Sequence, residues 1–376
     1  MANNNKDIIE RKLRAIAANV TNCKMDQVSL KLQINTEKNK LGGGMYGTAY
    51  KAYASNGKTV PFVVKKIKKI NNNDQESQIE HDTIRFLQNK IPPFARERIP
   101  HVYGFQICNN DEYLFSNIIK GVTLEKFKPS SEIQMASIIT QVLYTLYIIN
   151  EKIPSFRHHD LHKNNIMIVE DAKKELIIKI SGKNYKFNNG GVKAVIIDFG
   201  MATVEGVNNP KINYGEYNHI GISRTSKSIY DAHFFLNSIY LSAPKLKQQI
   251  KDPKIKESIT RVQQFIEKHF DKKFLVMGPT NLIKGGRLKK DAQNQINVKF
   301  SNIIENIDLL HLQKNSPRNN RKPNAKPNAK PNAKPNAKPN AKPNAKPKAN
   351  FFPSHMDILV REAAARKGIT VSEYKK

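Results

Sequence analysis

The N-terminal part of the chain alternates apolar and polar positions, a pattern typical of half-buried β-strands. From Val28 onward the alternation runs through VSLKLQI, LGGGMYGTAYKAYA and TVPFVVKKI. Asn56 and Gly57 separate the last two runs, and an Asn-Gly pair in this position predicts a β-hairpin. Residues 74–91 then change to a helical period, with one apolar stripe. We therefore expect an antiparallel sheet accompanied by one helix.

Helical periodicity dominates the middle of the chain. Residues 131–151 predict a helix with a continuous apolar stripe, and Ser131 with Gln134 matches a capping box at its N-terminus. Further core helices are expected over 228–240 and 259–270. The second part of the chain is therefore expected to be mainly helical.

Short apolar runs interrupt this helical region. Residues 166–167 and 195–197 are expected to be buried strands on either side of an unusually long connection. Within that connection, 175–180 and 185–187 flank Gly182 and predict a hairpin. Rigid strands therefore support the polar loops that precede and follow them.

Five segments follow from these patterns. An N-terminal extension carries an amphipathic helical pattern over residues 6–20. A β-rich lobe, a larger helical lobe, a linker of Pro-Asn-Ala-Lys repeats and a short helical segment come after it. Their expected bounds are 1–27, 28–116, 117–313, 314–350 and 351–376.

The charge of the chain is strongly positive, at +31. From Lys314 onward there are 12 lysines and 4 arginines against 3 acidic residues, and the rest of the chain is basic as well. Proline at every fourth position of the repeats blocks helix and sheet, which predicts a disordered basic tail. Nucleic acid or another polyanion is the partner that such a charge favours, although a spacer with a solvated surface explains it equally well.

Cysteines and the N-terminus indicate a reducing compartment. Cys23 and Cys108 are the only cysteines, too few for a disulfide framework, and we expect reduced thiols. The N-terminus has no apolar signal core, and no window is apolar enough for a transmembrane segment. We therefore expect a protein of the cytoplasm or nucleus that is not secreted.

Two polar motifs carry the candidate chemistry. HHDLHKNNIM contains Asp160 and Asn165, and VIIDFG contains Asp198. Asn165 and Asp198 offer the hard oxygen ligands that Mg²⁺ prefers, while Asp160 is suited to orient an attacking hydroxyl. The order and apolar flanks of the motifs favour phosphoryl transfer from ATP over two unrelated polar turns.

A glycine-rich stretch precedes these motifs, and a strand rather than a helix follows it. This order favours a loop that covers nucleotide phosphates over a dinucleotide fingerprint. Leu41 and Ala49 are expected to flank the adenine. The candidate nucleotide-binding residues are Leu41, Gly42, Gly43, Gly44, Met45, Tyr46, Gly47, Thr48, Ala49 and Lys65.

A lysine and a glutamate complete the candidate site. Lys65 lies on the strand FVVKKI, where its ammonium can reach the α and β phosphates. Strand alternation allows only one of Lys65 and Lys66 to point inward, and we favour Lys65. Glu80 on the following helix can pair with Lys65, and Glu76 is its rival one turn earlier.

The motifs of the chain are, in order, LGGGMYGTAYKA, FVVKK, Glu80, HHDLHKNNIM and IIDFGMA. The eukaryotic protein kinase superfamily has its motifs in the same order, and the chain resembles this superfamily over about residues 38–205. The resemblance implies a bilobal α+β fold, with a small antiparallel β lobe plus one helix and a larger mainly α lobe. It implies ATP with Mg²⁺ or Mn²⁺, a protein substrate with a serine or threonine hydroxyl, and Asp160, Lys65 and Glu80 as catalytic residues. Asp231 would brace the catalytic loop.

Departures from the family pattern narrow the resemblance. His159 replaces the arginine before the catalytic aspartate, so switching by loop phosphorylation is not expected, and His162 replaces the usual lysine. The lengthened hairpin before IIDFG resembles serine/threonine kinases of large DNA viruses, such as iridoviruses. This origin would place the protein in the host cell and in the virion.

Two alternatives remain open from the sequence. Asp-Leu-His-x-x-Asn also resembles small-molecule phosphotransferases of the aminoglycoside kinase type. A basic ATP-binding scaffold or virion protein, with a tail that binds polyanions, is the alternative outside enzymes.

Overall fold

The computed structural model describes residues 11, 30–31, 39–43, 47–55, 59–68, 75–107, 111–213, 215 and 217–311. These residues belong to one compact unit, Met1–His311. Apart from Arg11, the helix expected over 6–20 lies outside the described residues, as do the expected segments 314–350 and 351–376.

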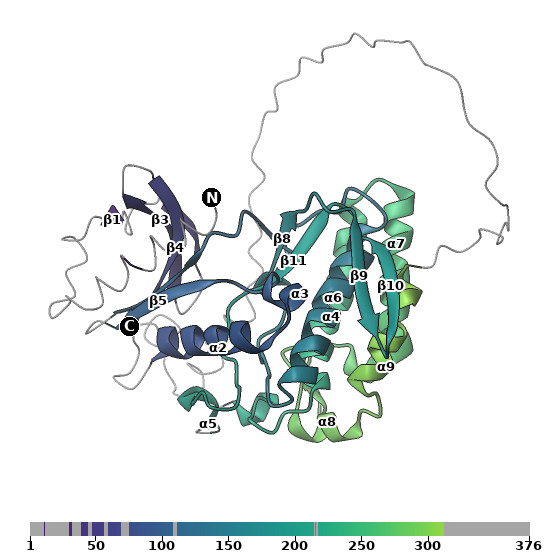
Figure 1. The fold of residues 1–376 in the computed structure, drawn as a ribbon. Coiled ribbons are helices and arrows are strands. Elements are labelled where there is room, and N and C mark those ends of the chain that lie inside the picture. The colour runs from purple at the N-terminus through teal and green to yellow at the C-terminus, as the bar shows by residue number, and fades with distance from the viewer. Residues whose placement is uncertain are drawn as a thin grey trace, which may run out of the picture. The chain divides into compact units, whose positions relative to one another are not determined.

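An antiparallel sheet with one long helix beside it forms the first lobe (Figure 1). Its strand order is β1-β3-β4-β6-β5, and β2 pairs with β3. Ser55 lies opposite Thr59, so the hairpin predicted around Asn56 and Gly57 is confirmed. The strands are β1 (Leu30–Lys31), β2 (Lys40–Gly43), β3 (Gly47–Ser55), β4 (Thr59–Lys68), β5 (Val102–Ile107) and β6 (Asp111–Asn117).

The helix α2 (Glu76–Lys90) packs against β5 and β6. Its apolar stripe is buried, as the helical period predicts. The carboxylate of Glu112 on β6 is fully buried and accepts hydrogen bonds from the backbone N–H and the hydroxyl of Ser77, both at 2.7 Å. Because a carboxylate at a helix N-terminus satisfies donors that have no partner within the helix, this contact fixes the start of α2 to the sheet.

The second lobe is mainly helical and contains most of the core. Its two long central helices are almost entirely buried along their inner faces. The helices are α3 (Pro93–Arg96), α4 (Gln134–Lys152), α5 (Pro210–Asn213), α6 (Ile229–Gln249), α7 (Pro253–His269), α8 (Lys290–Gln295) and α9 (Phe300–Glu305), with short 3-10 helices at Lys163–Asn165, Asn218–Ile220, Lys272–Phe274 and Ile307–Leu310. A β-rich lobe and a helical lobe confirm the expected α+β fold.

The predicted capping box at the start of α4 is wrong. The helix begins at Gln134, and the Ser131 hydroxyl has no hydrogen-bond partner among the described residues. Instead, the side-chain oxygen of Gln134 accepts a hydrogen bond of 2.7 Å from the backbone N–H of Ser130. The Gln134 amide nitrogen donates to the Gly190 carbonyl at 3.0 Å, so a contact with a distant loop competes with the local cap.

Strands in the second lobe support the polar loops. β7 (Gly121–Thr123), β8 (Ile166–Glu170) and β11 (Val192–Ile196) form a three-stranded sheet, and β9 (Glu175–Ile180) pairs with β10 (Lys183–Asn188) as the predicted hairpin. A short hairpin with two residues in each strand, β12 (Ile283–Lys284) and β13 (Arg287–Leu288), was not predicted.

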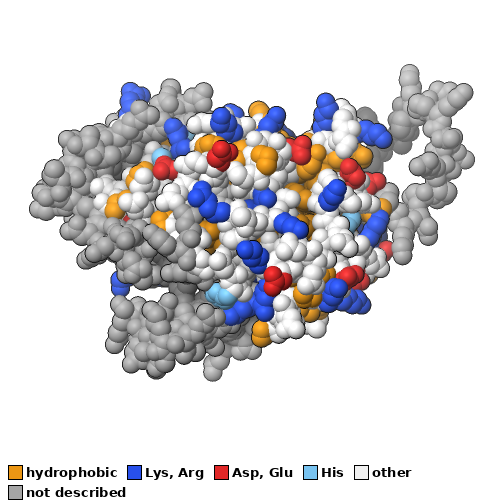
Figure 2. All heavy atoms as spheres, turned by 90° about the horizontal axis from the view of Figure 1, so that it is seen from below, with side chains coloured by type: hydrophobic (Ala, Val, Ile, Leu, Met, Phe, Trp, Pro, Cys, Tyr) orange, Lys and Arg blue, Asp and Glu red, His pale blue; other side chains and the backbone are white. Residues whose placement is uncertain are grey.

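The surface of the described part is rich in cations. Figure 2 shows lysine and arginine side chains spread over the face seen from below, among fewer acidic ones. In the part of the chain that the structure describes, no helix has both the length and the apolar character needed to cross a membrane.

Buried histidines should make the fold sensitive to acid. His233 on α6 is fully buried, and its Nε2–H donates to the Phe274 carbonyl at 2.8 Å. Burial lowers the pKa of His233 from 6.5 to about 4. As the pH falls below 6.5, His233 binds a proton in the unfolded chain but not in the folded chain. The free energy of unfolding that is present above pH 6.5 is therefore lost progressively toward pH 4. His233 alone should lower the free energy of unfolding by about 3 kcal/mol between pH 6.5 and pH 4.

Urea unfolding of wild type and His233→Gln at a series of pH values measures this effect. Glutamine can still donate to the Phe274 carbonyl but does not titrate, so the variant should lose less stability between pH 6.5 and pH 4. Equal pH dependence in the two proteins would contradict the assignment to His233.

Candidate functional site

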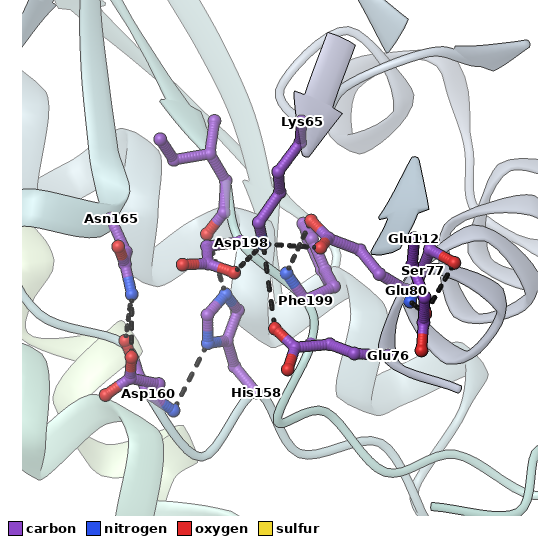
Figure 3. A network of polar contacts seen from close by, with 12 residues as sticks. Lys65, Glu76, Ser77, Glu80, Glu112, His158, Asp160, Asn165, Asp198 and Phe199 are labelled. Atoms are coloured by element: carbon purple, nitrogen blue, oxygen red, sulfur yellow. Dashed lines mark hydrogen bonds and ion pairs between the residues drawn. The ribbon is translucent and has the colours of Figure 1, made fainter. Parts of the chain in front are cut away.

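Lys65 is the centre of a cluster of acidic side chains (Figure 3). Its Nζ lies 2.7 Å from Glu80 Oε2 and 2.7 Å from Asp198 Oδ1. Burial alone would lower the pKa of Lys65, but Asp198, Glu80 and Glu76 outweigh burial and raise the pKa well above its usual value. Lys65 is therefore a permanent cation. Lys66 points to the other face of β4 and pairs with Asp111 at 2.9 Å.

Glu80 connects the sheet to the segment after β11. Besides binding Lys65, its other oxygen accepts a hydrogen bond of 3.2 Å from the backbone N–H of Phe199. A buried carboxylate with two partners has a fixed orientation, so the position of α2 determines those of both Lys65 and Phe199.

Glu76, the rival of Glu80, has a different set of partners. It lies 4.0 Å from Lys65 and forms an ion pair with Lys211 on α5. It also packs against Gly200, where an added Cβ would lie 2.9 Å from the Glu76 carboxylate. Glu76 therefore links α2 to the segment after Gly200, and Glu80 is the closer partner of Lys65.

Asp160 and Asn165 form the second part of the site. The Asn165 amide nitrogen donates to the Asp160 carbonyl at 2.8 Å and to Asp160 Oδ2 at 3.0 Å. With its nitrogen turned toward Asp160, the amide of Asn165 presents its oxygen in the opposite direction. Burial would raise the pKa of Asp160, but His162 and Arg287 outweigh it and hold the pKa far below its usual value. Asp160 is thus an anion at neutral pH.

Backbone hydrogen bonds join the two parts of the site. The N–H of Ile197 donates to the Asn165 carbonyl at 2.9 Å. His158 faces the Ile197 carbonyl with Nε2 at 3.1 Å, while its Nδ1 accepts from the backbone N–H of Asp160 at 3.3 Å. Burial lowers the pKa of His158, which agrees with a neutral ring protonated on Nε2. Asp160, Asn165 and Asp198 are therefore held by one rigid framework.

Two residues of this framework have left-handed backbones. Asp198 has φ 67° and His159 has φ 62°, values that non-glycine residues rarely adopt. Asp231 on α6 stabilises the second, because its carboxylate accepts the backbone N–H groups of His158 and His159 at 2.7 and 2.8 Å. This is the bracing position expected for Asp231. Such conformations persist where surrounding contacts enforce them, commonly at functional sites.

His159 and His162 differ in their surroundings. His159 is fully buried, its Nε2 lies 3.0 Å from the Thr203 hydroxyl, and burial lowers its pKa well below the usual value. A neutral, buried ring is not available to a phosphate on another segment, and the absence of switching by loop phosphorylation stays a prediction from the sequence. His162 Nε2 lies 3.7 Å from Asp160 Oδ2.

The candidate nucleotide-binding stretch is only partly described. Gly44, Met45 and Tyr46 lie outside the described residues, Leu41 is 52% exposed, and Gly42, Gly43, Thr48 and Ala49 lie on β2 and β3. A Cβ at Gly47 would lie 2.5 Å from the Lys66 carbonyl oxygen. Glycine at this position is therefore required by the close approach of β3 and β4.

Arg287 is the site residue that the sequence argument missed. It comes from β13, is 1% exposed, and forms an ion pair with Asp160 and a hydrogen bond to the His159 carbonyl. Its sequence signal is slight: an arginine after Gly285-Gly286, between Ile283 and Leu288.

The oxygen donors fit a magnesium ion that is shared with phosphates. Asn165 and Asp198 supply an amide oxygen and a carboxylate, and the Asp198 side chain is 43% exposed. Within the described ranges, no group of three or more histidine, cysteine or acidic side chains could hold a metal by itself. Mg²⁺ typically binds to one or two carboxylates plus substrate phosphates, so this incomplete donor set suits it.

The fold and this site together define a class. A small antiparallel β lobe supplies Lys65 and Glu80, and a helical lobe supplies Asp160, Asn165 and Asp198. This arrangement is typical of protein kinases.

Comparisons with known proteins find similarity to kinases of large DNA viruses. The family model described as Poxvirus serine/threonine protein kinase matches residues 106–280. "Putative serine/threonine-protein kinase R400" of Acanthamoeba polyphaga mimivirus is 30% identical over 42% of this chain and 34% of its own length. "Probable kinase 098L" of Invertebrate iridescent virus 3 is 31% identical over 31% of this chain and 22% of its own length. The chain is thus similar to serine/threonine kinases of large DNA viruses, as its sequence predicts.

The extent of these matches is limited. The matched region spans about a third or less of the two viral relatives. A crystal structure of a kinase domain aligns over 72% of this chain and 88% of its own, with 16% identity and a TM-score of 0.39. The fold therefore rests on the strands and helices described above.

Proposed function

We propose that this chain is an ATP-dependent protein kinase that transfers the γ-phosphoryl group of ATP to a serine or threonine hydroxyl. The observation that carries the proposal is the joint geometry of two groups of side chains. Lys65 contacts both Glu80 and Asp198, and Asp160 with Asn165 is bound to the segment of Asp198 through Ile197. A cation for phosphates and a carboxylate for the acceptor are thus connected through one segment of the chain.

The first lobe binds the nucleotide in this proposal. Lys65 binds the α and β phosphates, and Glu80 holds the lysine in place by their contact of 2.7 Å. The stretch from Leu41 to Ala49 covers the nucleotide, with Gly42, Gly43, Gly44, Met45, Tyr46, Gly47 and Thr48 between them. Backbone N–H groups of such a stretch can approach phosphates closely where side chains are small.

Asn165 and Asp198 are the proposed ligands for Mg²⁺ or Mn²⁺. A metal ion at this position would neutralise charge on the phosphate oxygens during transfer. Partial burial would raise the pKa of Asp198, but the Lys65 ammonium outweighs it and lowers the pKa, so the ligand stays ionised. The hydrogen bonds from the Asn165 nitrogen to Asp160 leave its oxygen for the metal.

Asp160 orients the acceptor hydroxyl and receives its proton. The hydroxyl oxygen forms a bond to the γ-phosphorus while the bond from phosphorus to the β–γ bridging oxygen breaks, and ADP leaves. Since the transition state of phosphoryl transfer is loose, the strength of the base matters less than its position. An Asp160 whose pKa is held low is therefore suited to the task.

A protein hydroxyl is the favoured acceptor. The names of the matched family and of the first viral relative both specify serine/threonine protein kinases. These similarities disfavour the small-molecule phosphotransferase that the Asp-Leu-His motif also resembles. With viral relatives, the proposed location of the protein is the cytoplasm or nucleus of a host cell, and the virion.

The test is transfer of ³²P from labelled ATP, with Mg²⁺ or Mn²⁺, to casein, histone, myelin basic protein and the kinase itself. Acid hydrolysis then identifies the labelled amino acid, and Asp198→Asn protein prepared in parallel excludes a contaminating kinase. Label on serine or threonine that depends on wild-type protein is the expected result. Label only on aminoglycosides or similar alcohols would replace this proposal with the small-molecule one.

The basic tail is proposed to bind polyanions, on charge alone. Its 12 lysines and 4 arginines from Lys314 onward favour nucleic acid or anionic surfaces. A chain truncated after Gln313 should elute from heparin and from DNA at a lower salt concentration than the full chain, while its ATP turnover is unchanged. Equal elution of the two proteins would contradict this role.

A further inference from the structure

Arg287 occupies an unusual position for an arginine. Its side chain is 1% exposed, and it ranks among the largest fully buried side chains in the described residues. A guanidinium in a protein interior costs free energy unless charged and hydrogen-bonding partners surround it. A buried Arg287 therefore depends on the partners that surround it.

Arg287 contacts the loop that carries His159 and Asp160. One guanidinium nitrogen forms an ion pair with Asp160 Oδ1, and another donates to the His159 carbonyl. Asp160 Oδ2 is bound separately by the Asn165 amide at 3.0 Å. The two oxygens of the carboxylate are therefore held from different sides, which leaves the side chain one orientation.

The surrounding fold presents this guanidinium rigidly. Its central carbon lies 3.9 Å from the centre of the Phe234 ring, and the Tyr230 hydroxyl is a further hydrogen-bonding neighbour. The hairpin that carries it is bound to α6, because the Asn237 amide nitrogen donates to the carbonyls of Val276 and Gly286 at 3.0 and 2.9 Å. Gly286 has φ 74°, which permits the tight turn directly before Arg287.

We propose that Arg287 is a positioning residue for phosphoryl transfer, which fixes the Asp160 carboxylate in the orientation that receives the acceptor hydroxyl. This inference rests on the proposed function. Arg287 acts through Asp160 and does not touch the phosphates, because it is almost completely shielded from solvent. Its charge also lies beside a loop in which His162 replaces a lysine, and a guanidinium supplies a permanent cation there.

A double-mutant cycle with Asp160→Asn separates this role from general structural support. If Arg287 acts only by orienting the carboxylate, Arg287→Met should matter only while the carboxylate is present. We expect Arg287→Met alone to lower kcat about 30-fold with little change in KM for ATP, and to change kcat less than about twofold in the Asp160→Asn background. Arg287→Lys should recover kcat to within about fivefold of wild type, because it retains a cation for Asp160.

The rates are measured as ³²P transfer and normalised to the fraction of protein that binds a fluorescent ATP analogue, so unfolded protein does not contribute. Lys289→Met is the matched control: it lies two residues further along, binds the Thr280 carbonyl, and should leave kcat unchanged. If Arg287→Met does not fold, Arg287→Lys is carried through the same cycle, and its smaller loss should likewise disappear in the Asp160→Asn background.

Wild-type kcat in Arg287→Met, or equal losses with and without the Asp160 carboxylate, would overturn the positioning role while leaving the kinase proposal intact. Absence of any transfer to protein by the wild type would overturn the proposed function itself, and this inference with it.

Discussion

Asp198→Asn should lower kcat for protein phosphorylation about 10³-fold at any concentration of Mg²⁺ or Mn²⁺. The substitution removes the only full negative charge among the two proposed metal ligands and weakens the 2.7 Å ion pair with Lys65. Loss of folding should not contribute. Asparagine accepts a left-handed backbone better than most residues, so the φ of 67° at this position is retained at little cost.

Steady-state rates across a titration of each metal ion, with thermal melts alongside, measure this prediction. Glu205→Gln is a suitable control, because it removes an exposed acid a few residues after Asp198 that is not among the ion-pair partners found for Lys65 in the described residues. A variant with kcat within about tenfold of wild type at saturating metal would exclude Asp198 as a ligand for the catalytic ion.

Local patterns in the sequence predicted the supports of the site well. Strand alternation separated Lys65 from Lys66, and the structure places Lys66 against Asp111 on the opposite face. The helical period likewise placed Glu80 at the edge of an apolar stripe, within reach of β4. These predictions depend on residues within one strand or one helix, where side-chain direction follows from geometry alone.

Two contacts that cations outside the motifs make with distant segments could not be predicted. Arg287 meets Asp160 across 127 positions, and Lys211 meets Glu76 across 135. Neither cation lies in a long periodic element: α5 has four residues and β13 has two. The register of such short elements is determined by tertiary packing. The same cause explains the failed capping box, where the remote Gly190 carbonyl binds the side chain of Gln134.

Asp160→Asn should lower kcat about 10³-fold, for a different reason from Asp198→Asn. The amide cannot accept the hydroxyl proton, and it also conflicts with its neighbours. Whichever way it turns, its NH₂ group faces either the Arg287 guanidinium or the Asn165 nitrogen, both of which are donors. The melting temperature should therefore fall as well, because Arg287 would remain buried without its anionic partner.

Nucleotide affinity separates the two variants. Among the described residues, Asp160 has no hydrogen bond or ion pair with Lys65 or with the strands proposed to bind the nucleotide. KM for ATP and the affinity for an ATP analogue should therefore stay within about twofold of wild type in Asp160→Asn. Asp198→Asn should instead weaken the metal dependence of nucleotide binding. Single-turnover transfer at saturating ATP and metal gives the rate of the chemical step directly. A normal single-turnover rate in Asp160→Asn would assign reception of the acceptor hydroxyl to another group, with His162, 3.7 Å from Asp160, as a candidate.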